Sequence, residues 1–156
     1  MKKNKFFTVL LILLPLAIGL LSAYITSDEM ALFNQINKPP LSPPAWLFPI
    51  AWTILYLLMG IAAAIVYTSQ VNNSSRKIGL LLHCVQLILN FFWSLIFFNM
   101  KAYLFSFLWL VLLWLSVFSM IIAYKNVSKS AYLLNIPYLC WLTFAAYLNL
   151  AIFILN

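Results

Sequence analysis

The sequence predicts an all-α integral membrane protein, a bundle of five transmembrane helices. Of its 156 residues, 66% are hydrophobic and only 7% are charged, which is more apolar surface than a soluble domain of this length could bury. Five apolar runs of about 20 residues match the length needed to cross a hydrocarbon core of roughly 30 Å. These runs are apolar on every side, whereas transmembrane strands alternate apolar and polar residues.

The first predicted helix covers about residues 6–26 and follows the basic stretch MKKNK. A signal peptide has a similar beginning, but this apolar run is longer than the usual core of about 7–15 residues. The stretch LLSAYITSDE also offers only a poor cleavage site. We therefore interpret the run as a transmembrane helix.

A proline-rich loop, about residues 27–45, separates the first helix from the second. Loops of about 20 residues usually carry a function or are disordered. The stretch KPPLSPP contains four prolines, and each proline fixes its own φ and restrains the residue before it. We therefore expect an ordered external lid over one end of the bundle.

The other helices are predicted at about residues 46–68, 79–99, 103–124 and 132–155. Only NMKA joins the third helix to the fourth, so these two must be antiparallel neighbours. No internal repeat or composition break divides the chain. We expect residues 1–156 to form a single domain.

Basic residues fall mostly on one predicted side of the membrane. They are Lys2, Lys3, Lys5, Arg76, Lys77, Lys125 and Lys129. The positive-inside rule then places the N-terminus in the cytoplasm and the C-terminus outside. The net charge of +7 also suits anionic lipid headgroups. No basic stripe with interleaved aromatics lies outside the spans, so nucleic acid is not an expected partner.

Metal and hydrolytic sites are not predicted. Asp28 and Glu29 are adjacent loop acids rather than a catalytic pair. His83 and Cys84 are neighbours in a predicted helix and would point about 100° apart, which does not suit two ligands of one ion. We expect Cys84 and Cys140 to be buried, unpaired thiols.

The third predicted helix carries a polar stripe. Its members are His83, Gln86, Asn90 and Trp93, spaced i, i+3, i+7 and i+10. Polar groups in a span cost free energy unless they find partners, so this stripe should face the bundle interior. The side chains would either hydrogen-bond between helices or contact a ligand.

Two further helix faces carry aromatic and small residues. They are Trp52, Tyr56, Gly60 and Ala63 in the second helix, and Tyr138, Trp141, Ala145 and Leu148 in the fifth. Small residues allow close helix packing or leave room for a flat ligand, and aromatics in spans also serve packing or the interface belt. Three such faces under a lid predict a concave apolar pocket for a large, planar, hydrophobic ligand.

Three stretches of the sequence resemble one known family. KPPLSPPAWLFPIAWTILYLLMG, QLILNFFWSLIFF and PYLCWLTFAAYLNLAIFILN are similar to the translocator protein family, also called tryptophan-rich sensory proteins (TspO) or peripheral-type benzodiazepine receptors. The resemblance covers essentially the whole chain. It implies a five-helix bundle, often a homodimer, that binds protoporphyrin IX, benzodiazepine-type ligands and, in animal members, cholesterol.

The resemblance also implies the site residues. Together with Tyr56 and Tyr138 from the faces above, the predicted ligand-binding set is Lys38, Trp52, Tyr56, Asn90, Trp93, Phe105, Tyr138, Trp141, Ala145 and Leu148. Lys38 in the lid would pair with a ligand propionate. Leu41 stands where many members have an aromatic residue. No basic residue follows Tyr147, so sterol binding is not expected.

Three functions remain open at this point. The first is a porphyrin-binding protein that degrades its ligand in light, with Trp52 and Trp141 as catalytic residues because a photoexcited porphyrin can oxidise a nearby indole. The second is a porphyrin transporter, and the third a non-enzymatic receptor or stress sensor. Protoporphyrin IX would be ligand or substrate, with no other cofactor, and the expected location is a bacterial plasma membrane.

Overall fold

The computed structural model describes residues 4–32, 35–71 and 74–156. Within these ranges the regular elements are helices: α1 (Lys5–Ile25), α2 (Ser27–Leu32), α3 (Leu47–Thr68), α4 (Ser74–Ser94), the π-helical turn η2 (Leu95–Asn99), α5 (Tyr103–Lys125) and α6 (Lys129–Leu155). Five helical segments, counting α4 and η2 as one, are long and apolar enough to cross a membrane. The predicted all-α membrane bundle is confirmed.

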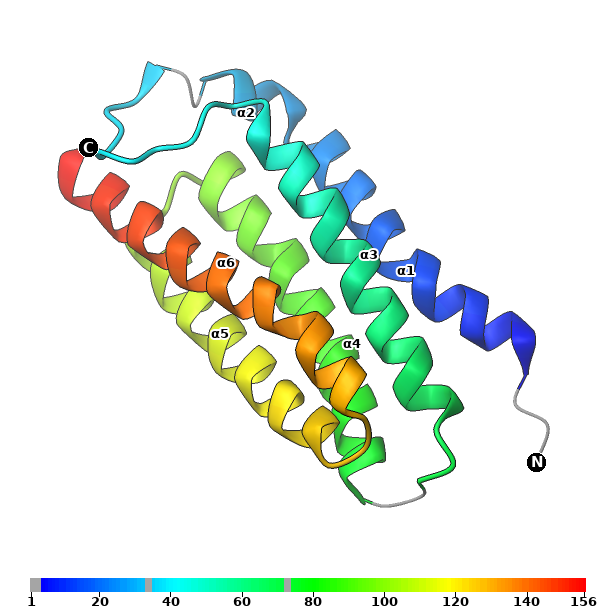
Figure 1. Ribbon diagram of the computed structural model, residues 1–156. Helices are drawn as coiled ribbons and strands as arrows, with labels where there is room; N and C mark the ends of the chain where they lie inside the picture. Colours follow the sequence, from blue (N-terminus) through cyan, green and yellow to red (C-terminus); the bar gives the residue numbers. More distant parts are fainter. Residues whose placement is uncertain (1–3, 33–34, 72–73) are drawn as a thin grey trace.

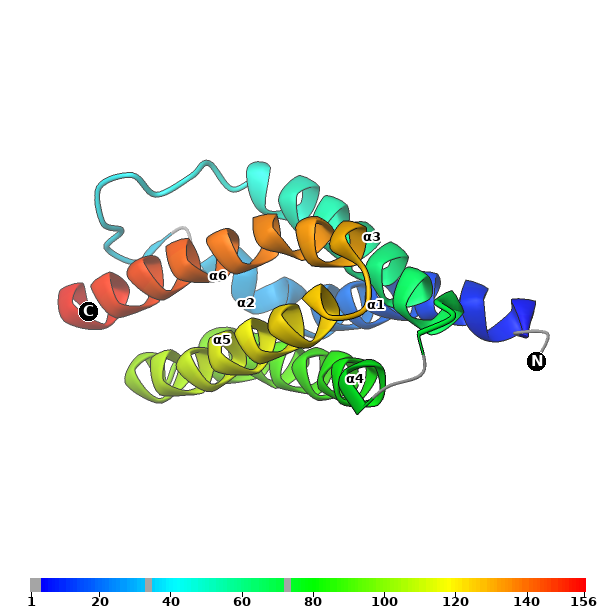
Figure 2. The ribbon, with the colours of Figure 1, turned by 60° about the horizontal axis from the view of Figure 1, so that its bottom comes forward.

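The long helices pack as a ring (Figure 1). α1 packs on α3, α3 on α6, α6 on α5, α5 on α4, and α4 on α1. Figure 2 shows α3 and α6 in one layer and α4 and α5 in the other. α1 begins and α6 ends at opposite ends of the bundle, as an odd number of crossings requires. Which end faces the cytoplasm stays a prediction.

Two helices begin earlier than predicted because their first turns are polar. α4 begins at Ser74 rather than at about residue 79, and its Arg76 donates a hydrogen bond from Nη2 to the Tyr67 carbonyl at 2.9 Å. α6 begins at Lys129 rather than at about residue 132. The Ser128 hydroxyl oxygen caps α6 by accepting from the Ala131 N–H at 3.4 Å, as N-cap serines commonly do.

The predicted loop 27–45 is partly helical. Its first part forms α2, with Asp28 and Glu29 in the first turn, where the exposed N–H groups of a helix favour negative charge. We call residues 35–46 the lid. In the lid, the Ser42 N–H donates to the Pro39 carbonyl at 3.3 Å, and Leu41 closes this turn with φ of 70°.

The lid is docked onto the end of α6. The Tyr147 hydroxyl donates to the Pro40 carbonyl at 2.9 Å. The Asn37 N–H donates to Asn156 Oδ1 at 3.0 Å, and Asn156 Nδ2 donates to the Asn37 carbonyl at 3.0 Å. These contacts fix the lid at one end of the bundle, beside the site described next.

Gly60 sets the distance between α1 and α3. A Cβ at Gly60 would lie 2.5 Å from the carbonyl oxygen of Ile12 and 2.8 Å from its Cα. These are backbone atoms of α1, which cannot move independently of the helix. At Gly60, the small-residue face predicted in the second long helix, α3, therefore serves close helix packing rather than ligand binding.

Candidate functional site

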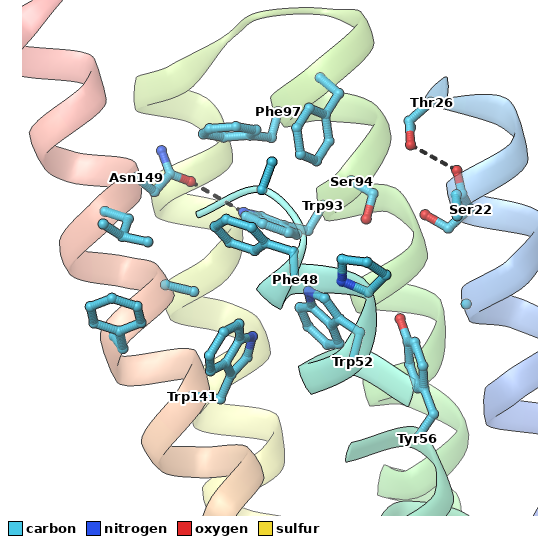
Figure 3. A pocket seen from close by; sticks show the side chains of 18 of the residues that line it. Ser22, Thr26, Phe48, Trp52, Tyr56, Trp93, Ser94, Phe97, Trp141 and Asn149 are labelled. Atoms are coloured by element: carbon cyan, nitrogen blue, oxygen red, sulfur yellow. Dashed lines mark hydrogen bonds between the residues drawn. The ribbon is translucent and has the colours of Figure 1, made fainter. Parts of the chain in front are cut away.

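The half of the bundle under the lid contains a cavity of about 270 Å³ (Figure 3). Helices α1, α3, α4 and α6 line it together with η2, and Ala45 of the lid adds to the lining. The described residues of α5 take no part in this lining. The cavity is therefore lined by residues that are far apart in the sequence, from Gly19 to Ile152.

An aromatic cluster around Trp52 forms one wall. The Trp52 ring stacks on Tyr56 with centroids 5.3 Å apart and an angle of 29° between the planes. It meets Trp141 edge-to-face, at 6.4 Å and 84°, and Trp93 lies 6.5 Å away at 36°. Figure 3 shows Trp52 reaching from α3 towards Trp141 on α6. Two indoles at right angles thus form a corner that offers both a ring face and a ring edge.

Asn149 is the polar centre of the part of the lining that α6 supplies. Its Oδ1 accepts from Trp93 Nε1 at 3.2 Å and from the Ser106 hydroxyl at 3.0 Å. Its Nδ2 donates to the Tyr103 carbonyl at 2.8 Å. The amide therefore orients the Trp93 indole and joins α4, α5 and α6.

Sequence reasoning missed Asn149, although a signal was present. Asn149 follows Trp141 by eight positions and Ala145 by four, so it lies on the same helix face. A polar side chain at that place in an apolar span needs a hydrogen-bond partner. This requirement alone predicts that Asn149 faces the interior of the bundle.

The wall from α1 was also missed. Gly19, Ser22, Ala23 and Thr26 line the cavity with the spacing i, i+3, i+4 and i+7. The Thr26 hydroxyl donates to the Ser22 carbonyl at 2.9 Å (Figure 3). A Cβ at Gly19 would overlap the ring of Tyr56, with Cδ2 only 2.6 Å away. The stripe of small residues in α1 was the sequence signal for this wall.

The π-helical turn η2 brings two consecutive phenylalanines to the cavity. Phe97 and Phe98 both line it, whereas neighbours in an α-helix point about 100° apart. The Met100 N–H donates to the Leu95 carbonyl at 3.0 Å, the i to i+5 pattern of a π turn. Phe97 also stacks on Trp93 at 5.4 Å and 25°. Such turns are frequent at functional sites.

The structure brings most of the predicted site residues to this cavity. Its lining includes Trp52, Tyr56, Trp93, Trp141, Ala145 and Leu148. Their shared cavity is the observation on which any role for them in ligand binding rests.

Asn90 and Tyr138 do not line the cavity. Both are fully buried, and Asn90 Nδ2 donates to the Tyr138 hydroxyl at 3.2 Å. The Tyr138 hydroxyl donates in turn to Gln86 Oε1 at 3.0 Å. The polar stripe of α4 therefore faces the interior as predicted, and at these positions it joins α4 to α6.

Phe105 and Lys38 also lie outside the cavity lining. Phe105 on α5 is half exposed, and its ring packs against Trp109 with centroids 6.1 Å apart. Lys38 lies in the lid and is partly buried. Phe105 lies outside the cavity because α5 packs on α4 and α6 and supplies no residue to the cavity lining.

The expectation of buried cysteines was wrong. Cys84 and Cys140 are both unpaired, as expected, but both are exposed on the bundle surface. A thiol behaves as a small hydrophobe, so a surface facing lipid accepts it as readily as a core does.

Comparison with known proteins gives a consistent assignment. The chain matches the model of the TspO/MBR family over residues 11–155. It is 40% identical to the "Tryptophan-rich protein TspO" of Chlorobaculum tepidum, covering 100% of this chain and 99% of that protein. It is 40% identical to "Protein CrtK" of Rhodobacter capsulatus (81% and 79% covered). It is 32% identical to the "Translocator protein" of Ovis aries (81% and 75% covered).

Proposed function

The chain belongs to the TspO/MBR family, and on this premise we propose that it binds protoporphyrin IX and benzodiazepine-type ligands within the membrane. The protein crosses the membrane several times. The proposed site is the cavity under the lid. Its lining is predominantly apolar and aromatic, with a few polar groups from Ser22, Thr26, Ser94 and Asn149, which is the usual composition of a small-molecule site.

The observation that carries the proposal is the right angle between Trp52 and Trp141. A flat ring system that enters the corner can stack on one indole and present its edge to the other. Each aromatic contact of this kind contributes about 0.5–1.5 kcal/mol beyond the area it buries. A planar, hydrophobic ligand therefore fits this wall better than a flexible or polar one.

The size of the cavity supports binding with local adjustment. Its 270 Å³ is close to the lower end of the roughly 300–1,000 Å³ typical of ligand pockets. A benzodiazepine-sized molecule needs little more space. A tetrapyrrole needs the lid or the rings of η2 to move, and both border the cavity.

The same two indoles provide a route to light-dependent breakdown of the porphyrin. A photoexcited porphyrin can take one electron from Trp52 or Trp141, and the reduced porphyrin can pass that electron to dioxygen to give superoxide. The indole radical and the reactive oxygen species are then held beside the macrocycle. We propose Trp52 and Trp141 as the residues that carry this chemistry.

Illumination of the purified protein with protoporphyrin IX tests the proposal. The Soret absorbance should decay faster than in detergent alone. The double substitution Trp52→Phe, Trp141→Phe should abolish this excess decay while keeping much of the binding in the dark. Trp114→Phe is the matched control, since Trp114 donates a hydrogen bond to Thr143 on the outer surface. With this variant the Soret absorbance should decay as fast as with the wild type. Undiminished decay in the double variant would remove these indoles from the chemistry.

The same experiment separates the other functions. A bound porphyrin that survives illumination would indicate a receptor or sensor, and ligand-dependent flux into sealed vesicles would indicate a transporter. We further propose a homodimer in a bacterial plasma membrane with the N-terminus in the cytoplasm. Light scattering of the protein in detergent tests the dimer, and protease protection in vesicles tests the orientation.

A further inference from the structure

A second, smaller chamber adjoins the cavity near the turn between α4 and α5. Its volume is about 200 Å³. Phe97 and Phe98 line both this chamber and the cavity, so their two rings form the partition between them. Glu29 from α2 and Lys101 from the turn lie on the far side of the partition.

The two compartments differ in charge. The residues described for the cavity lining include no acid or base. The chamber holds both, and Lys101 Nζ lies 2.9 Å from Glu29 Oε2. An apolar aromatic compartment and a charged one therefore share a wall of two phenylalanines.

Lys101 has a strained backbone conformation. Its φ is 51°, in the left-handed region that residues other than glycine adopt only at a cost. The preceding η2 turn imposes this conformation, and the Ala102 N–H donates to the Ile96 carbonyl at 3.3 Å. Strain of this kind is concentrated at functional sites, where the surrounding structure maintains it. Lys101 lines the chamber directly after this turn.

The Glu29–Lys101 ion pair is partly exposed. The side chain of Lys101 is 51% exposed and that of Glu29 is 32% exposed. Water reaches the Lys101 side of this pair and weakens it, although the Glu29 Oε2 atom itself is buried. An incoming carboxylate could reach the exposed Lys101 side chain and exchange one ion pair for another.

We propose that the Glu29–Lys101 chamber is a carboxylate subsite of the cavity. It takes an amphipathic ligand whose flat ring system fills the aromatic corner and whose carboxylate passes the Phe97–Phe98 partition to Lys101. Glu29 is the internal competitor that holds the ammonium when no ligand is bound. The inference rests on the proposed porphyrin-binding function and assigns the propionate to Lys101 rather than to Lys38 of the lid.

Two ligands that differ only in charge test the subsite. Dissociation constants of protoporphyrin IX and of its dimethyl ester are measured by tryptophan quenching in a non-ionic detergent. Lys101→Met should weaken binding of the diacid by about tenfold, the order of magnitude expected for a lost hydrogen bond to a charged group, and leave binding of the ester unchanged. Glu29→Gln should strengthen binding of the diacid. Lys129→Met, at the exposed start of α6, is the matched control and should change neither constant.

The outcomes distinguish this inference from the proposed function. Binding of the ester by Lys101→Met also shows that the variant is folded. If Lys101→Met weakens binding of the diacid and the ester equally, or of neither, the subsite is overturned. Porphyrin binding by the wild type would still stand. Loss of the diacid alone in Lys38→Met but not in Lys101→Met would move the carboxylate to the lid. Failure of the wild type to bind either ligand would overturn the proposed function itself.

Discussion

Asn37 and Asn156 are joined by two reciprocal hydrogen bonds of 3.0 Å, from the Asn37 N–H to Asn156 Oδ1 and from Asn156 Nδ2 to the Asn37 carbonyl. A third bond, from Asn37 Nδ2 to the Leu155 carbonyl, measures 3.3 Å. The lid is thereby tied to the end of α6, more than a hundred residues away in the sequence. Movement of the lid requires these bonds to break.

Asn156→Ala should loosen the lid. The substitution removes both side-chain bonds to Asn37, so the dissociation rate of a bound ligand should rise several-fold while the helix content stays unchanged. Stopped-flow displacement of protoporphyrin IX measures this rate, with Asn126→Ala at the exposed end of α5 as the control. Equal rates in all three proteins would show that the lid does not limit ligand release.

Tyr138→Phe should separate packing from ligand contact. The hydroxyl accepts from Asn90 and donates to Gln86, so its loss should lower the free energy of unfolding by about 1–2 kcal/mol, as for hydrogen bonds between transmembrane helices. The porphyrin dissociation constant should stay nearly unchanged, because Tyr138 does not line the cavity. Denaturation and titration of one sample measure both. A large loss of affinity with unchanged stability would return Tyr138 and Asn90 to the binding site.

Gly60→Ala should force α1 away from α3. The new methyl group would meet the backbone of Ile12, and overpacking of this kind costs about 1–3 kcal/mol. Thermal unfolding in detergent measures the loss, with Ile61→Val at the next, exposed position as the control. Unchanged stability would mean that the two helices are not held at this distance.

Gly19→Ala should act on the cavity instead. Its methyl group would meet the ring of Tyr56, which stacks on Trp52. The aromatic corner would have to shift, so porphyrin affinity should fall by about tenfold, or roughly 1.4 kcal/mol. Titration of protoporphyrin IX into Gly19→Ala and into Gly60→Ala compares the affinities of the two variants. Wild-type affinity in Gly19→Ala would show that the ligand does not use this corner.

The sequence allowed prediction of the five spans because each needs a long apolar run and nothing else in the chain has one. The first turns of α4 and α6 were missed because they are polar and lie outside the apolar runs from which the spans were predicted. The aromatic faces of α3 and α6 were visible as periodic large residues. The α1 wall was overlooked because its signal is a stripe of small residues such as Gly19 and Ser22, which is weaker than a row of aromatic residues.

The remaining differences depend on tertiary structure. No sequence pattern indicated that η2 would take a π turn and bring Phe97 and Phe98 to the same cavity. Asn90 and Trp93 share one stripe, yet Trp93 reaches the cavity while Asn90 bonds Tyr138. Helix periodicity assigns a side chain to the interior, but the neighbouring helices decide whether it meets a partner or an open space.

Titration of protoporphyrin IX into the purified protein in the dark, followed by tryptophan fluorescence, tests the central claim most directly. Ala145 lines the cavity, and Leu150 on the same helix is exposed. The account predicts saturable quenching for the wild type and for Leu150→Phe, and loss of quenching for Ala145→Phe, which fills the cavity. Equal quenching of all three folded proteins would contradict the assignment of the aromatic cavity as the porphyrin site.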